Sequence, residues 1–162
     1  VFDALGSVGK PGHEVAFKWP NDILLNGSKV GGLLLEAETA GGVPDWVILG
    51  VGVNVTVFPG DADFPATSLR AEGWGATEVA VLEAFGRHFV SWTGKWLDKG
   101  FEPIRKTWLW RAHGKGEEIE IRLGEETVTG VFADLDEHGA LVVETADGER
   151  RIAAGDVFFR ED

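Results

Sequence analysis

Apolar side chains repeat at helical spacing in the first part of the chain and at strand spacing in the last part. Residues 77–98 carry the helical repeat, and Thr77 before them is a suitable N-cap. Pro103 predicts the first turn of a second helix, through about Arg111, and residues 1–5 resemble the last turns of another. We expect the apolar face of the 77–98 helix to be buried in the core. Its members are Val81, Leu82, Phe85, Phe89, Trp92 and Trp96.

From Gly114 onward the apolar period changes to two. Residues 119–123 alternate strictly, and glycine-containing turns separate them from further short runs at 127–132, 140–144 and 150–153. Four or five short strands with closely spaced turns predict a small antiparallel barrel. We therefore divide the chain into a first domain, residues 1–113, and a second, residues 114–162. The sequence of the second domain does not decide whether it is a structural cap or also serves ligand and partner binding.

A tight hairpin is predicted near the start of the chain. Asn26-Gly27 separates two short apolar runs, and Asn-Gly is the strongest short signal for a two-residue type I′ turn. In that register Leu24 faces Lys29, and Asp22 lies on the same face, diagonal to Lys29 at about 7–8 Å. We expect a gap between the ammonium and the carboxylate that a phosphate with its magnesium ion could occupy. The alternative is an ordinary cross-strand ion pair.

A second unusual strand is predicted at residues 47–55. This run is rich in β-branched residues, and Gly50, Gly52 and Asn54 follow one another at every second position. One face of the strand is therefore bare and ends in a carboxamide, which offers donors and an acceptor to a base edge. Close packing of another element over the glycines is the alternative interpretation.

Three ordered motifs support a family resemblance. They are Lys18-Trp19-Pro20-Asn21-Asp22, the lysine at position 29 followed by Gly31-Gly32, and Gly50–Asn54. Together they resemble the catalytic domain of biotin–protein ligases, whose pattern is K-W-P-N-D, then a lysine near G-G-[IL]-L-x-E, then G-x-G-x-N. The resemblance implies an α+β fold. In that fold, part of a class II synthetase-like mixed sheet with helices precedes a small SH3-like β-barrel.

The resemblance also implies residue roles on the biotin side. Lys29 matches the catalytic lysine, which contacts the biotin carboxylate and the α-phosphate of ATP. Gly31 and Gly32 match the positions that line the biotin side of the site.

On the nucleotide side, Asn21 and Asp22 match residues that hold ATP and its Mg²⁺, with Asp22 as the metal-linked carboxylate. Asn54 is expected to face the adenine, and Arg160 matches a C-terminal arginine that supports the nucleotide region. Some relatives stack a tryptophan on the adenine where this chain has Ala66, so that contact is not expected here.

The implied activity is that of a biotin–[acetyl-CoA-carboxylase] ligase, an enzyme that activates biotin with ATP and transfers it to a lysine of a biotin carboxyl carrier protein. A lipoate–protein ligase and a non-catalytic fragment that binds a carrier or partner are the alternatives. Family members carry a G-R-G-R-x-x-R-x-W loop before K-W-P-N-D, and this sequence has no such string. We therefore expect a truncated chain that is inactive in isolation.

Composition restricts the remaining possibilities. The 162 residues carry a net charge of −12, which disfavours binding to a nucleic-acid backbone. The sequence has no cysteine and only four scattered histidines, so thiolate metal sites are excluded and a histidine metal site is not indicated. No run is long and apolar enough for a membrane span, and we expect a cytoplasmic protein. A homodimer is possible.

Overall fold

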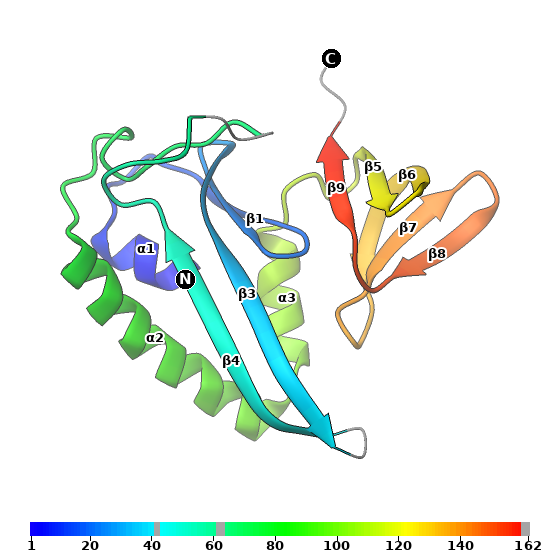
Figure 1. Ribbon diagram of the computed structural model, residues 1–162, viewed down its shortest axis with the longest axis horizontal. Coiled ribbons are helices and arrows are strands. Elements are labelled where there is room, and N and C mark those ends of the chain that lie inside the picture. Colours follow the sequence, from blue (N-terminus) through cyan, green and yellow to red (C-terminus); the bar gives the residue numbers. More distant parts are fainter. Residues whose placement is uncertain (41–42, 61–63, 160–162) are drawn as a thin grey trace.

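The computed structural model describes residues 1–40, 43–60 and 64–159. It shows two antiparallel sheets and three helices (Figure 1). The first sheet has the order β1-β2-β3-β4. Its strands are β1 (Val15–Lys18), β2 (Asp22–Leu25), β3 (Ser28–Ala40) and β4 (Val43–Val53). Neighbouring strands are antiparallel, and parallel pairing in the described residues is confined to two isolated bridges, Phe17 with Ala112 and Lys29 with Ala66.

The predicted hairpin joins β2 to β3. Asn26 and Gly27 both have positive φ angles, 50° and 81°, as a type I′ turn requires. Leu24 pairs with Lys29, as predicted. The register then shifts between Ile23 and Leu24, and this irregularity brings Asp22 opposite Gly32. The hairpin prediction is confirmed, and the shift adds a detail that the sequence pattern did not show.

Three helices accompany the first sheet: α1 (Phe2–Val8), α2 (Glu78–Lys99) and α3 (Glu102–Trp110). The predicted cap of α2 is present, since the Thr77 hydroxyl accepts a hydrogen bond from the Ala80 amide at 3.2 Å. Trp92 on α2 donates to the Asp3 carboxylate of α1 at 2.6 Å, which ties these two helices together. No helix in the described ranges has the length and apolar character needed to cross a bilayer.

The predicted burial of the α2 face is only partly correct. Val81 is buried, but Leu82, Phe89 and Trp96 are 67%, 46% and 55% exposed. Figure 1 shows α2 running alongside the long β3–β4 ribbon, and only the first turns of the helix reach the core cluster of the first sheet. Apolar spacing defines a helix face but not the element that covers it, and the described residues leave Leu82, Phe89 and Trp96 largely uncovered.

The second sheet has the order β8-β7-β6-β5-β9. Its strands are β5 (Glu118–Leu123), β6 (Glu126–Leu135), β7 (Leu141–Thr145), β8 (Gly148–Ile152) and β9 (Asp156–Phe159). All four ladders are antiparallel, as predicted for the C-terminal domain. Within the described residues the two end strands, β8 and β9, are not paired with each other, so the sheet is not closed into a complete barrel.

Trp19 connects the two sheets. It lies in the turn between β1 and β2, but its side chain is only 6% exposed and belongs to the core cluster of the second sheet. There it joins Ile119, Ile121 and Phe132, and α3 contributes Trp108 to the rim of the same cluster. The turn that contains the K-W-P-N-D motif is thereby fixed between the two sheets.

Candidate active site

One row of directly opposed residues crosses all four strands of the first sheet. Lys18 pairs with Asp22, Asp22 with Gly32, and Gly32 with Gly52. Directly opposed residues share a face of a sheet. The row therefore places two charged side chains at one end of this face and two positions without a side chain at the other.

Lys29 reaches this row from the start of β3. Its amide donates to the Pro65 carbonyl at 2.7 Å, and its carbonyl accepts from the Thr67 amide at 2.9 Å, so the loop at 65–67 holds the backbone of the lysine. The Nζ atom lies 2.5 Å from Oδ1 of Asp22. The side chains of Lys29 and Asp22 are 39% and 20% exposed, respectively.

The two groups thus share one face, as expected, but the predicted gap between them is wrong. The flexible lysine stem closes the distance across the strands, and the pair is the direct ion pair that was the alternative interpretation. Partly exposed pairs of this kind are worth about 0–1 kcal/mol, so a phosphate can separate them at small cost.

The two neighbouring glycines of β3 have different surroundings. A Cβ atom on Gly31 would lie 2.5 Å from the Gly52 carbonyl oxygen, which is too close for any side chain. A Cβ atom on Gly32 would meet Oδ1 of Asp22 at 3.5 Å and Cε of Lys29 at 3.7 Å, which are ordinary contacts. Gly31 is therefore needed for strand packing, whereas a side chain at Gly32 would cover the ion pair.

Asn54 follows directly after β4 and holds the neighbouring loop. Its Nδ2 donates to the Thr67 carbonyl at 3.0 Å, its amide donates to the Val30 carbonyl at 2.7 Å, and its carbonyl accepts from the Leu69 amide at 2.9 Å. The carboxamide therefore positions the loop that holds Lys29. Its Oδ1 has no hydrogen-bond partner among the described residues.

Lys18 was not selected from the sequence as a site residue, but it lies at the centre of the charged end. It is 6% exposed, and its Nζ lies 3.1 Å from the centroid of the Phe64 ring. Burial lowers the pKa of Lys18 to about 8; Asp22 and Asp156 act in the opposite direction, and Lys29 adds to the lowering. The sequence signal that could have found this residue is its place opposite Asp22 at the ends of two short strands.

The ring beneath Lys18 belongs to a stack that reaches the second sheet. Phe64 stacks on Phe158 of β9 with ring centroids 5.1 Å apart, and the Arg122 guanidinium lies 3.8 Å from the Phe158 centroid. Neither phenylalanine carries a local motif, so no sequence signal pointed to them.

Two adjoining cavities of about 260 and 410 Å³ flank the ion pair. Both are lined by Lys18, Asp22, Lys29 and Phe64, and the larger one also by Asn21 and Asp156. Gly32, Gly52 and Asn54 continue the same region along the sheet. Arg160, the remaining predicted site residue, lies outside the described residues.

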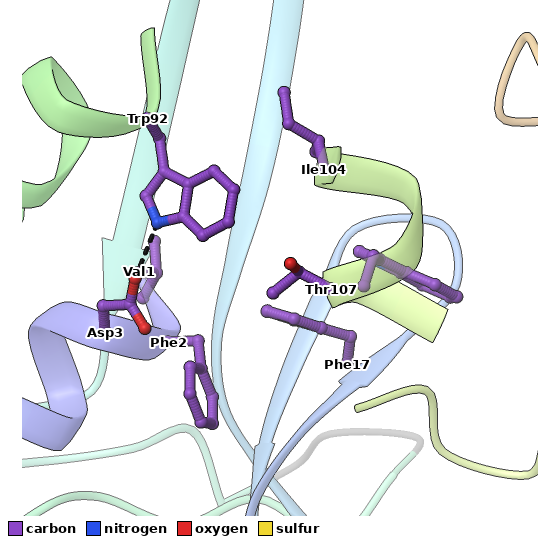
Figure 2. Close-up of a pocket in the computed structure, with 8 residues that line it drawn as sticks. Val1, Phe2, Asp3, Phe17, Trp92, Ile104 and Thr107 are labelled. Atoms are coloured by element: carbon purple, nitrogen blue, oxygen red, sulfur yellow. Dashed lines mark hydrogen bonds between the residues drawn. The ribbon is translucent and has the colours of Figure 1, made fainter. Parts of the chain in front are cut away.

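A third cavity, of about 180 Å³, lies on the helix side of the first sheet (Figure 2). Figure 2 shows Phe17 and Thr107 on one side of it and Trp92 and Asp3 on the other. Phe17 precedes Lys18 in β1, and successive strand residues point to opposite faces. The sheet therefore separates this largely apolar cavity from the charged one.

Among the described residues, the groups at the charged end could hold a magnesium ion only together with ligands from a substrate. Within the described ranges no cluster of three or more His, Cys, Asp or Glu side chains could hold a metal ion alone. Mg²⁺ is commonly bound by one or two carboxylates together with substrate phosphates. Asp22, with the carbonyl-bearing side chain of Asn21 next to it in the cavity lining, fits that type of donor set.

Comparisons with known proteins agree with this arrangement. Residues 1–110 match the model of the biotin/lipoate A/B protein ligase family, and residues 115–160 match the biotin protein ligase C-terminal domain. The chain is 38% identical to the biotin–[acetyl-CoA-carboxylase] ligase of Paracoccus denitrificans, over 98% of this chain and 69% of that protein. It is 33% identical to the bifunctional ligase/repressor BirA of Bacillus subtilis, over 90% of this chain but only 46% of that protein.

Solved structures give the same result. The apo biotin protein ligase of Aquifex aeolicus superposes with a TM-score of 0.80 at 26% identity, covering 99% of this chain and 70% of that one. The same ligase in complex with biotin and ATP gives a TM-score of 0.79 at 26% identity, covering 99% and 67%. With both the sequence models and the fold in agreement, this chain belongs to the biotin/lipoate A/B protein ligase family.

Proposed function

We propose that this chain provides the nucleotide- and biotin-binding sheet and the C-terminal domain of a biotin–protein ligase. The observation that carries the proposal is the Lys29–Asp22 ion pair at 2.5 Å, set at the end of a row that continues through Gly32 and Gly52. The family match and the Aquifex aeolicus ligase structure with biotin and ATP support it. The match of residues 115–160 to a biotin protein ligase domain favours biotin over lipoate.

In the first step, a carboxylate oxygen of biotin attacks the α-phosphorus of ATP. A bond forms between that oxygen and the phosphorus, the bond from the phosphorus to the β-phosphate oxygen breaks, and pyrophosphate leaves. Two anions must approach each other for this to happen. Lys29, released from Asp22, lies between them, reduces their repulsion and stabilises the charge that gathers on the α-phosphate in the transition state.

Magnesium fits this arrangement as a partner of the nucleotide. Asp22 and Asn21 are the residues that would hold it, together with phosphate oxygens, and the ion would supply charge neutralisation to the leaving pyrophosphate. With Asp22 turned away from it, the ammonium of Lys29 would be available to the α-phosphate and the biotin carboxylate. The ion pair thus keeps both groups in place before the ligand arrives.

In the second step, the amine of a lysine on a carrier protein attacks the carbonyl carbon of the mixed anhydride. The new amide bond forms, AMP leaves, and the amine loses its extra proton. We propose the biotin carboxyl carrier protein of acetyl-CoA carboxylase, or of a related carboxylase, as the acceptor. The Paracoccus denitrificans relative is named for that class of acceptor.

The remaining site residues keep their proposed roles. Asn54 faces the adenine through its Oδ1, and Gly32, with Gly31 behind it, lines the biotin side. Arg160 supports the nucleotide from the C-terminal end. We also propose a domain boundary between residues 113 and 114, a cytoplasmic location, and a homodimer as a possible assembly.

Biotin-dependent exchange of labelled pyrophosphate into ATP tests the first step, in the protein as its gene encodes it. We expect exchange with biotin but not with lipoate, and a rate about 10²–10³-fold lower for Lys29→Ala. Lys99→Ala, at the exposed end of α2, is the matched control and keeps the wild-type rate.

Three results would overturn the proposal: no exchange with either acid, exchange with lipoate alone, or a Lys29→Ala rate close to that of wild type. Transfer is tested separately, by mass spectrometry of a carrier domain after incubation with biotin and Mg·ATP. A gain of one biotin on a single carrier lysine is expected.

A further inference from the structure

The ammonium of Lys18 is a buried cation whose bonding is unusual. Its residue is 6% exposed, and among the described residues its Nζ makes cation–π contacts but no hydrogen bond or ion pair. The nearest carboxylate, that of Asp22 directly opposite, is engaged by Lys29. Among the residues that the structure describes, the protein groups around Lys18 therefore compensate its buried charge only in part.

The contact with the Phe64 ring compensates only part of the cost of burying the Lys18 ammonium. A cation over an aromatic face gains about 0.5–2 kcal/mol, whereas burying a charge without a fully bonded partner costs more than that. The lowered pKa of Lys18 reflects the same imbalance. A side chain that is costly to bury and lines both cavities beside the Lys29–Asp22 pair is better explained by a ligand than by the stability of the fold.

The position of Lys18 indicates which part of the ligand it binds. Lys18 and Lys29 stand on either side of Asp22, because Lys18 is opposite it in the β1–β2 ladder and Lys29 contacts it from β3. Under the proposed function, Lys29 serves the α-phosphate and Asp22 the magnesium ion bound to the phosphates. The cation on the far side of Asp22 then lies beside the phosphates that leave.

We propose that Lys18 is a second phosphate-binding cation, which binds the β- and γ-phosphates of ATP and the pyrophosphate formed from them. This inference rests on the proposed function. As the bond from the α-phosphorus to the β-phosphate oxygen breaks, its electron pair stays on the departing oxygen, and the added negative charge develops next to the Lys18 ammonium. Lys18 transfers no proton in this step. It lowers the energy of the leaving group.

The aromatic stack behind Lys18 connects its proposed phosphate contact to the second sheet. The ammonium rests on Phe64, Phe64 on Phe158, and Phe158 on Arg122. The last two residues belong to the second sheet. The leaving-group site is thus completed by the C-terminal domain, through the position of the ring on which the lysine rests.

Calorimetric titration with three probes tests the assignment: Mg·ATP, Mg·pyrophosphate and AMP. We expect Lys18→Met to weaken ATP and pyrophosphate binding about 10- to 100-fold, the range for loss of a charge-assisted contact, and to leave AMP binding within about twofold. Lys18→Arg should restore most of the affinity. Lys99→Met, which removes a lysine charge at the exposed end of α2, should change none of the three.

The pH profile supplies a readout that a structural role would not alter. Asp22, Lys29, Asp156 and His113 are the other titratable groups that face Lys18 or line its cavities. Since Lys18 loses its proton as the pH rises through about 8, wild-type pyrophosphate affinity should fall across that range relative to Lys18→Arg.

The outcomes separate the two proposals. If wild type binds neither ATP nor pyrophosphate, the proposed function fails. If wild type binds both and Lys18→Met binds them equally well, the ligase assignment stands and the role of Lys18 is refuted. Equal weakening of AMP and ATP binding would also refute it, because that result places Lys18 at the α-phosphate or the adenosine.

Discussion

The indole Nε1 of Trp19 donates a hydrogen bond to the carbonyl oxygen of Gly139, at 3.4 Å and across 120 positions of sequence. Trp19 belongs to the motif turn of the first sheet, and Gly139 lies in the turn before β7 of the second. A residue of the K-W-P-N-D motif is therefore an anchor between the two sheets, and Lys18 directly precedes it in the chain.

Truncating Trp19 should destabilise the protein strongly. Trp19→Ala removes a buried indole from the core cluster of the second sheet, and we expect a loss of about 3–5 kcal/mol in the free energy of unfolding. Trp19→Phe keeps much of the packing and should lose clearly less. Urea denaturation at equilibrium measures both, and equal stability of Trp19→Ala and wild type would show that the two sheets do not share this core.

The two glycines of β3 should respond differently to substitution. Gly31→Ala forces a Cβ to within 2.5 Å of the Gly52 carbonyl, so it should lower the unfolding free energy by about 1–3 kcal/mol through backbone displacement. Gly32→Val finds space but covers the Lys29–Asp22 pair. It should fold with a melting temperature near that of wild type and lose Mg·ATP and biotin binding in calorimetry. A Gly32→Val protein that binds both ligands normally would contradict the placement of the site.

Lys18 should stabilise the ligand complex at the expense of the free protein. Its pKa is lowered on folding from the usual 10.5 to about 8, so between these values the unfolded state binds more protons than the folded state. The contribution of Lys18 to the free energy of unfolding therefore rises with pH across that window, and its full penalty applies below about pH 8.

Lys18→Met removes this penalty together with the contact to Phe64. We expect a net gain in stability of about 1 kcal/mol at neutral pH, and a flatter stability profile between about pH 8 and 10.5. Chemical denaturation at several pH values checks both. A marked loss of stability would identify Lys18 as a purely structural residue.

We expect Glu72 to stabilise the β2–β3 hairpin through hydrogen bonds. Its carboxylate accepts hydrogen bonds from Asn26 Nδ2 and Thr67 Oγ1, both at 2.7 Å, and so ties the hairpin turn to the loop that holds Lys29. These two bonds, that from Thr67 first, lower the pKa of Glu72 below its usual 4.5.

We expect Glu72→Ala to cost about 1–3 kcal/mol at neutral pH. Because the folded pKa is the lower one, this contribution is complete above about pH 4.5 and disappears as the pH falls through the folded value. The difference between variant and wild type should therefore shrink in acid. Glu137→Ala, at a side chain that is 87% exposed, is the control and should match wild type throughout.

The sequence pattern correctly predicted the features that depend on residues close together in the chain. The Asn26-Gly27 turn, the Thr77 cap and the alternation of residues 119–123 depend on neighbours in the chain, and each appears in the structure as expected. The placement of Asp22 and Lys29 on one face followed from the same local geometry. The first strand, β1, has only four residues, and its pattern was too short to separate it from the motif turn.

Contacts between distant segments could not be predicted, because the sequence pattern reports only on residues that are close together in the chain. Phe64, Phe158 and Arg122 form the stack under Lys18, but they come from a loop and two strands that no spacing rule relates. The direct Lys29–Asp22 contact depends on the flexible lysine stem, which register alone does not fix. The burial of Leu82, Phe89 and Trp96 was misjudged because periodicity reports which side chains are apolar and not what lies over them.

The exposed apolar side chains of α2 govern how the chain behaves in concentrated solution. Leu82, Phe89 and Trp96 present bare hydrocarbon to water, while a net charge of −12 keeps copies apart by repulsion. Added salt screens the repulsion and leaves the attraction, so light scattering should rise steeply with ionic strength and fall when glutamate replaces Leu82 and Phe89. Purification at low salt is the practical consequence.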